Sequence, residues 1–235
     1  MNPNPSQPDR TRVSGWEVAL PFIERIAKWT FLGLAVWVGW HILAPYPHYV
    51  PPDFEFGFLR GKRDFFYRSG YWLGFFAHLA GAPLALFSGA LQCSRTLRVR
   101  WPGLHRLLGR AYAILVLGLA APGGLIMATH AYGGLSGAIC FASIAACAWG
   151  CTWIGWRAAR IGNFEQHRRW ILRSYVLILS AVFLRLINLS LSTIGMDHEF
   201  TYQVSAWLSF VAPLGVLEWG LRQRKLRRNR ATNGT

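Results

Sequence analysis

The sequence predicts an all-α fold, a polytopic bundle of six transmembrane helices. Hydrophobic residues make up 53% of the chain and charged residues only 15%, whereas soluble domains are about 25% charged. Apolar runs of about 20 residues recur, the length of helix that crosses a bilayer core. Basic residues gather in alternate connections between these runs. This pattern excludes a soluble globular enzyme, a disordered chain and a disulfide-stapled secreted domain.

The apolar runs define the domain organisation. Each run is predicted to be helical because lipid offers no hydrogen-bond partners to backbone groups. A polar segment at 1–25 precedes the membrane domain at 26–221, and a basic tail follows at 222–235. In the first loop, at 45–70, prolines and aromatic residues predict a short helix lying at the outer interface. The six predicted spans are 26–44, 71–92, 108–130, 135–156, 170–192 and 203–221.

The charge distribution predicts the orientation. The net charge is +15, and much of it lies in the connections after the second and fourth spans and in the tail. The positive-inside rule places these segments and both termini on the cytoplasmic side of the membrane. Anionic lipids at that face account for the basic excess, and we expect no nucleic-acid partner.

Two cytoplasmic helix starts resemble each other. His105-Arg106 opens the pattern H-R-x3-R-x-Y, which includes Arg110, and His167 opens H-R-x4-R-x-Y, which includes Arg173. A parallel duplication of helix hairpins would explain the likeness. A chance similarity between two arginine-rich turns is the alternative.

Four histidines in or beside the spans are candidate ligands of a haem iron. His78 and His130 form an outer pair, and His105 and His167 form an inner pair. About 38 Å of helix separates His105 from His130, so one cofactor cannot touch both. Haem b with two axial imidazoles needs such a pair at one depth. Equally, a histidine among arginines can bind lipid phosphate or cap a loop.

Several charged residues extend this hypothesis. Arg106, Arg110 and Arg173 surround the inner pair and would hold haem propionates. Arg185 lies inside the fifth span, where an arginine normally faces the bundle interior. We expect Arg185 to share a polar cavity with His78 and to bind an anion, or to bond neighbouring polar groups. Glu218 is expected to pair with Arg25, Lys28 or Arg222.

The motifs resemble a known family. Over about residues 70–190 the chain is similar to a bacterial "domain of unknown function 2306" family of predicted inner-membrane proteins. The motifs that carry the resemblance are His78-x10-Gly89, His105-Arg106-x2-Gly109-Arg110-x-Tyr112, His167-Arg168-Arg169-Trp170-x2-Arg173-Ser174-Tyr175 and Arg185. The resemblance implies a helical membrane fold and no established activity. A looser similarity to six-helix transmembrane b-type cytochromes implies haem, although the fourth span here carries no histidine.

Three classes of function follow. The first is a haem-b-type or quinone-linked transmembrane electron-transfer protein with a quinone or redox partner. The second is a non-redox transporter, or a protein that binds lipid or another anionic ligand. The third is an assembly or scaffold subunit that exposes a small-residue face such as Gly81/Ala85/Gly89. The sequence assigns no enzymatic reaction.

Overall fold

The computed structural model describes residues 33, 37–193, 195 and 197–233. The chain forms two compact units, at 1–60 and 61–235. The predicted N-terminal segment and most of the first predicted span lie outside the described residues. Within the described part, the only β pairing is an isolated bridge between Tyr49 and Pro52, so the fold is helical as predicted.

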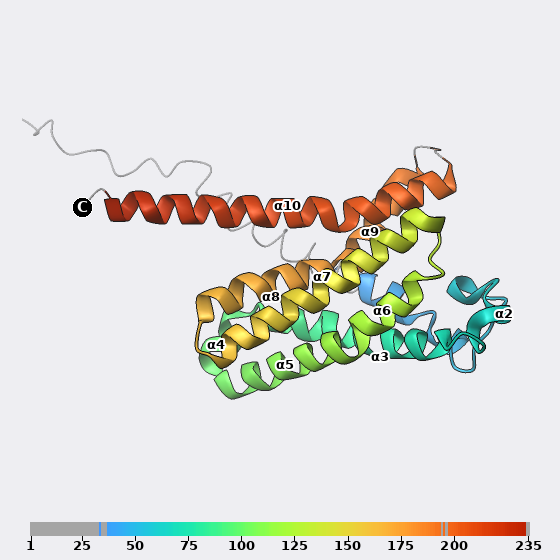
Figure 1. Ribbon diagram of the computed structural model, residues 1–235, viewed down its shortest axis with the longest axis horizontal. Helices are drawn as coiled ribbons and strands as arrows, with labels where there is room; N and C mark the ends of the chain where they lie inside the picture. Colours follow the sequence, from blue (N-terminus) through green and yellow to red (C-terminus); the bar gives the residue numbers. More distant parts are fainter. Residues whose placement is uncertain (1–32, 34–36, 194, 196, 234–235) are drawn as a thin grey trace, which may run out of the picture. The chain divides into compact units, whose positions relative to one another are not determined.

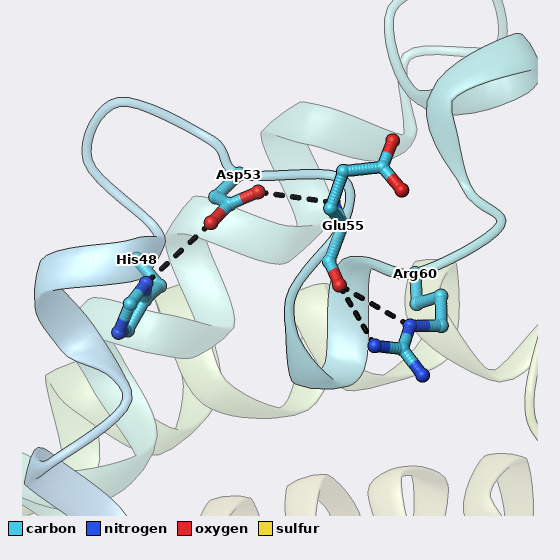
Figure 2. A network of polar contacts seen from close by, with 4 residues as sticks. All are labelled: His48, Asp53, Glu55 and Arg60. Carbon is cyan, nitrogen blue, oxygen red and sulfur yellow. Dashed lines mark hydrogen bonds and ion pairs between the residues drawn. The ribbon is translucent and has the colours of Figure 1, made fainter.

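The described loop of the first unit is held by its own polar contacts (Figure 2). The Asp53 carboxylate lies 3.5 Å from His48 Nδ1 and also accepts the Glu55 N–H at 3.0 Å. Arg60 donates twice to the Glu55 carbonyl, at 3.2 and 3.1 Å. His48 stacks on Phe56 with ring centroids 3.7 Å apart.

The first loop, predicted to hold a short interfacial helix, forms only short helical turns in its described residues. Two 3-10 turns, η1 (Tyr46–His48) and η2 (Gly57–Leu59), occupy the first unit, and a single helical turn, α2 (Arg63–Phe66), begins the second. Prolines remove backbone donors and so limit helix growth near η1. Phe66 is fully buried and packs against other rings, so it does not lie at a membrane surface.

The second unit contains the helices that correspond to the later predicted spans (Figure 1). Four of its described helical stretches are long and apolar enough to cross a membrane, and α8 with α9 forms a fifth if this pair, bent by 41°, is one span. The predicted count of six is therefore not confirmed. The helices are α3 (Tyr71–Gln92), α4 (Arg95–Arg100), α5 (Pro102–Ile114), α6 (Ala121–Ala128), α7 (Gly134–Arg160), α8 (Phe164–Ile178), α9 (Ser180–Ser192) and α10 (His198–Asn233), with the π-helical segment η3 (Leu115–Ala120) between α5 and α6.

Local sequence sets several of these boundaries. Gly70 and Gly133 adopt left-handed conformations, with φ of 70° and 87°, directly before α3 and α7. Ser94 caps α4 by accepting the Leu97 N–H, and Asn163 caps α8 by accepting the Gln166 N–H at 3.0 Å. Such side chains satisfy amide groups that have no partner within the helix.

The π-helical segment has a cause in the sequence. Pro122 follows η3 directly, has no N–H, and its ring would clash with the carbonyl four residues earlier in an α-helix. A wider turn relieves this clash. In a π-helix the carbonyl of Leu117 would pair with the amide of residue 122, which is this proline. The indole N–H of Trp149 donates to Leu117 O instead, at 3.2 Å.

The helices pack through small residues. α3 runs along α5, η3 and α6, α7 runs along α8, and α10 runs along α9. A Cβ added at Gly81 would lie 2.6 Å from the Leu119 side chain, and one at Gly89 would lie 2.4 Å from the Tyr175 ring. The Gly81/Ala85/Gly89 face is therefore occupied by the chain's own helices. The expectation that this face is exposed to a partner is wrong.

The basic segments gather at one end of the second unit. The His105 imidazole interacts electrostatically with Arg98 and with His167. The α4–α5 segment therefore lies near the start of α8. The start of α8 and the last turns of α10 line one cavity. We call this region, formed by 95–110, 165–173 and 221–230, the basic end, and the region around loops 129–133 and 193–197 the far end.

Candidate functional site

A chain of buried hydroxyl groups links three helices near the basic end. Tyr112 OH of α5 lies 2.7 Å from Ser174 Oγ of α8, which lies 2.6 Å from Thr152 Oγ1 of α7. Thr152 donates its single proton to Ala148 O, at 2.7 Å. Each hydroxyl has one proton, so Ser174 must donate to Thr152 and Tyr112 must donate to Ser174. The chain therefore has one direction, from Tyr112 to the α7 backbone.

The two similar helix starts, on α5 and α8, come together at this series of hydrogen-bonded hydroxyl groups. His105 is the fourth residue of α5 and His167 is the fourth residue of α8, so the sequence likeness is also a likeness of position. The Tyr112 and Tyr175 rings that end the motifs form an edge-to-face pair with centroids 6.4 Å apart. Tyr175 OH also donates to Leu86 O of α3, at 3.3 Å.

The inner pair of histidines lies beside this cluster. His167 Nδ1 is 2.8 Å from the Gly155 carbonyl oxygen, which can only accept, so Nδ1 carries the proton. His105 Nδ1 is buried and has no hydrogen-bond partner among the described residues. The positive charges of Arg98 and Arg106 act on His105. Arg106 and Arg110 are themselves exposed.

Arg173 is engaged by a carboxylate. Its Nε and Nη2 donate to the two oxygens of Glu218, at 2.5 and 3.0 Å, which joins α8 to α10. The guanidinium also lies over the Trp170 ring, 4.7 Å from the centroid. Glu218 pairs with Arg173 and not with Arg222, one of its three expected partners, because the packing of α8 on α10 places Arg173 opposite the carboxylate; Arg222 acts on Glu218 only through its charge. The other two expected partners, at positions 25 and 28, lie outside the described residues.

The outer pair of histidines occupies two separate environments. His78 Nδ1 donates to Ala120 O at 2.7 Å, where α3 crosses the π-helical segment. His130 bonds Thr129 Oγ1 at 2.8 Å and stacks on Phe65 with centroids 4.0 Å apart. His130 also packs edge-on to Tyr71, which is seven residues, or about 10 Å of helix, from His78. No contact joins the two histidines in the described structure.

Arg185 extends along its own helix. Its Nη1 donates to Ala181 O, at 2.7 Å, and the side chain is exposed. Its positive charge interacts electrostatically with both His78 and Tyr202, so Arg185 lies near both side chains. The polar cavity shared with His78 stays a prediction, since the side chain of Arg185 is exposed while its charge still acts on His78.

The structure shows functional candidates that the sequence analysis missed. Ser174 and Thr152 were not singled out, although Ser174 sits inside the repeated motif beside Tyr175. A buried hydroxyl group in an apolar helix needs a hydrogen-bond partner, and this requirement is the signal that could have identified both residues. Among the described residues, no group of three or more His, Cys, Asp or Glu side chains is arranged to hold a metal ion.

The fold and these sites define a polytopic helical membrane protein with buried polar groups between its helices. A family model described as "Predicted membrane protein (DUF2306)" matches residues 75–219, which is more than half of the chain. The chain belongs to this family. No curated protein and no solved structure matches it. The looser similarity to transmembrane b-type cytochromes therefore gains no support from the comparisons.

Proposed function

We propose that the protein is a membrane haem-b protein that transfers electrons, with His105 and His167 as the axial ligands. The observation that supports the proposal is the electrostatic interaction between these two imidazoles at the basic end, each on the fourth residue of its helix. Axial imidazoles on neighbouring helices suit haem iron. A quinone or another redox protein would exchange single electrons with the haem.

The protonation of the ring nitrogens supports this assignment. The Nδ1–H of His167 is fixed on Gly155 O, which leaves a lone pair on Nε2 for a metal. A ligating histidine commonly donates its other N–H to a backbone carbonyl in this way. A buried imidazole nitrogen without a partner, as in His105, also calls for a bound group.

The composition of the cluster favours a porphyrin over a bare metal ion. Structural zinc sites draw four ligands from the protein, whereas haem supplies four nitrogens of its own and needs only one or two axial side chains. Arg98 and Arg106 supply positive charge beside His105 for the haem propionates. Arg110 lies one turn beyond Arg106 on α5. Arg173 is already bonded to Glu218, so it would act on the haem only through its charge.

Optical spectroscopy tests the proposal. The full chain, expressed with ample haem and purified in detergent, should show a Soret band and reduced-minus-oxidised bands. The double variant His105→Ala/His167→Ala should lose them, and the control His41→Ala/His198→Ala should keep them. Absence of a Soret band in the unmodified protein would reject haem binding. Loss of the bands only in His78→Ala/His130→Ala would move the ligands to the outer pair.

A second candidate function is binding of an acidic ligand at Arg185. It is favoured by the convergence of the Arg185 charge on His78 and Tyr202. An arginine at this depth gains most from an anionic partner. With octanoate as the probe, thermal unfolding of the unmodified protein and of Arg185→Lys should shift upward, and that of Arg185→Met should not. Equal shifts in all three proteins would reject the site.

We also propose that the basic end faces the cytoplasm of the bacterium, with both termini on that side and anionic lipids around it. The charge pattern supports this orientation. Single cysteines at two exposed positions, Tyr132 in the far-end loop and Ile161 at the basic end, test it in a background without the native cysteines. A membrane-impermeant thiol reagent added to intact spheroplasts should label position 132 and spare 161. Labelling of 161 alone would reverse the orientation.

A further inference from the structure

A cavity of about 390 Å³ opens between α8 and α10 at the basic end. This volume lies in the range of small-molecule sites, about 300–1,000 Å³. Four cationic side chains and one carboxylate line it. The lining residues are Glu165, Arg168, Arg169, Leu172, Leu221, Arg224, Lys225 and Asn229.

Three of the four cations are not paired with a carboxylate in the described part of the chain. Arg169 is paired with Glu165, with Nη2 and Oε1 2.7 Å apart. Within the described part of the chain, Arg168, Arg224 and Lys225 have no ion-pair partner. These three side chains come from two helices and line the same cavity. An anion bound there would neutralise charges that otherwise repel one another.

The cavity has an apolar end and a polar end. α8 runs away from the basic end and α10 runs toward it, so Leu172 and Leu221 both lie one turn closer to the centre of the bundle than the cations. Glu165 and Asn229 lie on the opposite side of the cations. The order along the cavity is therefore apolar, cationic and then polar, which is also the order of acyl chain, phosphate and headgroup in a phospholipid.

From this arrangement we propose that the α8–α10 cavity binds a phosphate group, supplied by an anionic phospholipid. The guanidinium groups of Arg168 and Arg224 can donate paired hydrogen bonds to phosphate oxygens, and Lys225 adds a point charge. The two leucines would contact the acyl chains. Free inorganic phosphate offers the same oxygens and gains nothing from the leucines, so the two sources differ in affinity. The site is independent of the proposed haem.

Native mass spectrometry of the full chain in detergent tests this site. The probes are dioctanoyl phosphatidylglycerol, dioctanoyl phosphatidylcholine and inorganic phosphate at equal concentrations. Phosphatidylglycerol should bind most tightly. The variant Arg168→Gln/Arg224→Gln/Lys225→Gln should bind it roughly tenfold more weakly or worse, because each basic residue contributes separately to anionic lipid binding.

A matched control removes the same charge elsewhere. Arg95, Arg100 and Arg227 are exposed at the basic end and do not line the cavity, so their triple Gln variant should bind within about threefold of the unmodified protein. If the two triple variants lose the same amount of phosphatidylglycerol affinity, the net charge of the protein explains the binding and the proposed site is rejected. Inorganic phosphate binding as tightly as phosphatidylglycerol would reject the lipid as the source.

A charge-preserving variant covers the case in which the Gln variant does not fold. Arg168→Lys/Arg224→Lys/Lys225→Arg keeps three cations in the cavity and should retain most of the preference for phosphatidylglycerol over phosphatidylcholine. If this variant folds but loses the preference, the proposal is overturned, because the charge in the cavity would not be what selects the lipid.

Discussion

The basic end of the second unit and its other half, which leads to the far end and is called the far half below, satisfy polar groups within their helices in different ways. Near the basic end, several helices are joined by bonds between side chains, as in the Tyr112–Ser174–Thr152 chain and the Arg173–Glu218 pair, although His167 donates to a backbone carbonyl. In the far half, His78 and Arg185 each donate to a backbone carbonyl. A bond between two side chains depends on the identity of both residues. A bond from a side chain to a carbonyl depends on one residue and on the path of the helix backbone. Mutations should therefore act differently in the two regions.

The largest effect is expected where two backbones touch in the far half. A Cβ at Gly123 would lie 2.5 Å from Gly74 O and 2.7 Å from His78 N, both of which are backbone atoms. Gly123→Ala should lower the free energy of unfolding by about 3 kcal/mol, the upper range for overpacking. Gly118→Ala is the matched control, since nothing lies within 4 Å of its added Cβ. Chemical unfolding in detergent measures both, and equal stabilities would contradict the close crossing.

The next effect concerns the ion pair at the basic end. Glu218→Gln leaves a partly buried Arg173 without its carboxylate and should cost about 2 kcal/mol, less than the 3–5 kcal/mol of a fully buried pair. Glu165→Gln breaks the more exposed pair with Arg169 and should cost no more than about 0.5 kcal/mol. Thermal unfolding in detergent compares the two variants. A larger loss from Glu165→Gln would show that α8 and α10 are joined elsewhere.

The hydroxyl chain should give a smaller change. Tyr112→Phe removes the first donor and leaves the Ser174 oxygen with one bond fewer, at a cost of about 1–1.5 kcal/mol. Tyr132→Phe, at an exposed ring, should change stability by less than about 0.3 kcal/mol. Urea unfolding in detergent separates the two. If Tyr112→Phe is neutral, the Tyr112–Ser174 bond does not contribute to stability and the prediction is wrong.

The smallest effect is expected at the π-helical segment. Trp149→Phe removes the donor to Leu117 O and should cost about 0.5–1 kcal/mol. Trp153→Phe is the control, because Trp153 stacks on Trp149 and no hydrogen bond of its indole occurs in the described structure. Amide hydrogen exchange of η3 reports the change directly. Exchange that is faster in Trp153→Phe than in Trp149→Phe would contradict the carbonyl contact.

The apolar pattern predicts the helices well and their bends and ends poorly. Residues 71–92 form α3 as expected, because Gly70 precedes the apolar run and its last residue is Gln92. α7 and α10 continue past their predicted ends, since arginine and leucine favour helix and hydropathy detects only the bilayer core. The bend between Ile178 and Ser180 left no mark in the hydropathy of the predicted fifth span.

The candidate site could be predicted only in part. The repeated motifs predict that His105 and His167 are related, and in the structure the two imidazoles are near enough to interact electrostatically. The partner of Glu218 depends on which face of α10 meets α8, and helical periodicity does not fix that choice when a helix is apolar on most sides. Equal distance from a helix end suggested one depth for His78 and Arg185, but it says nothing of their orientation around the helix axis.

The π-helical segment also sets the rotational phase of the helix that contains it. A π turn holds one residue more than an α turn, and each residue of an α-helix advances the side chains by about 100°. Removing one residue from Leu115–Ala120 would restore an α-helical count while turning 121–128 by that angle about its own axis. Gly123 and Gly124 would then leave the surface of α3, and bulkier neighbours would take their place against His78. The extra residue thus works as an insertion that aligns two halves of one span with different neighbours.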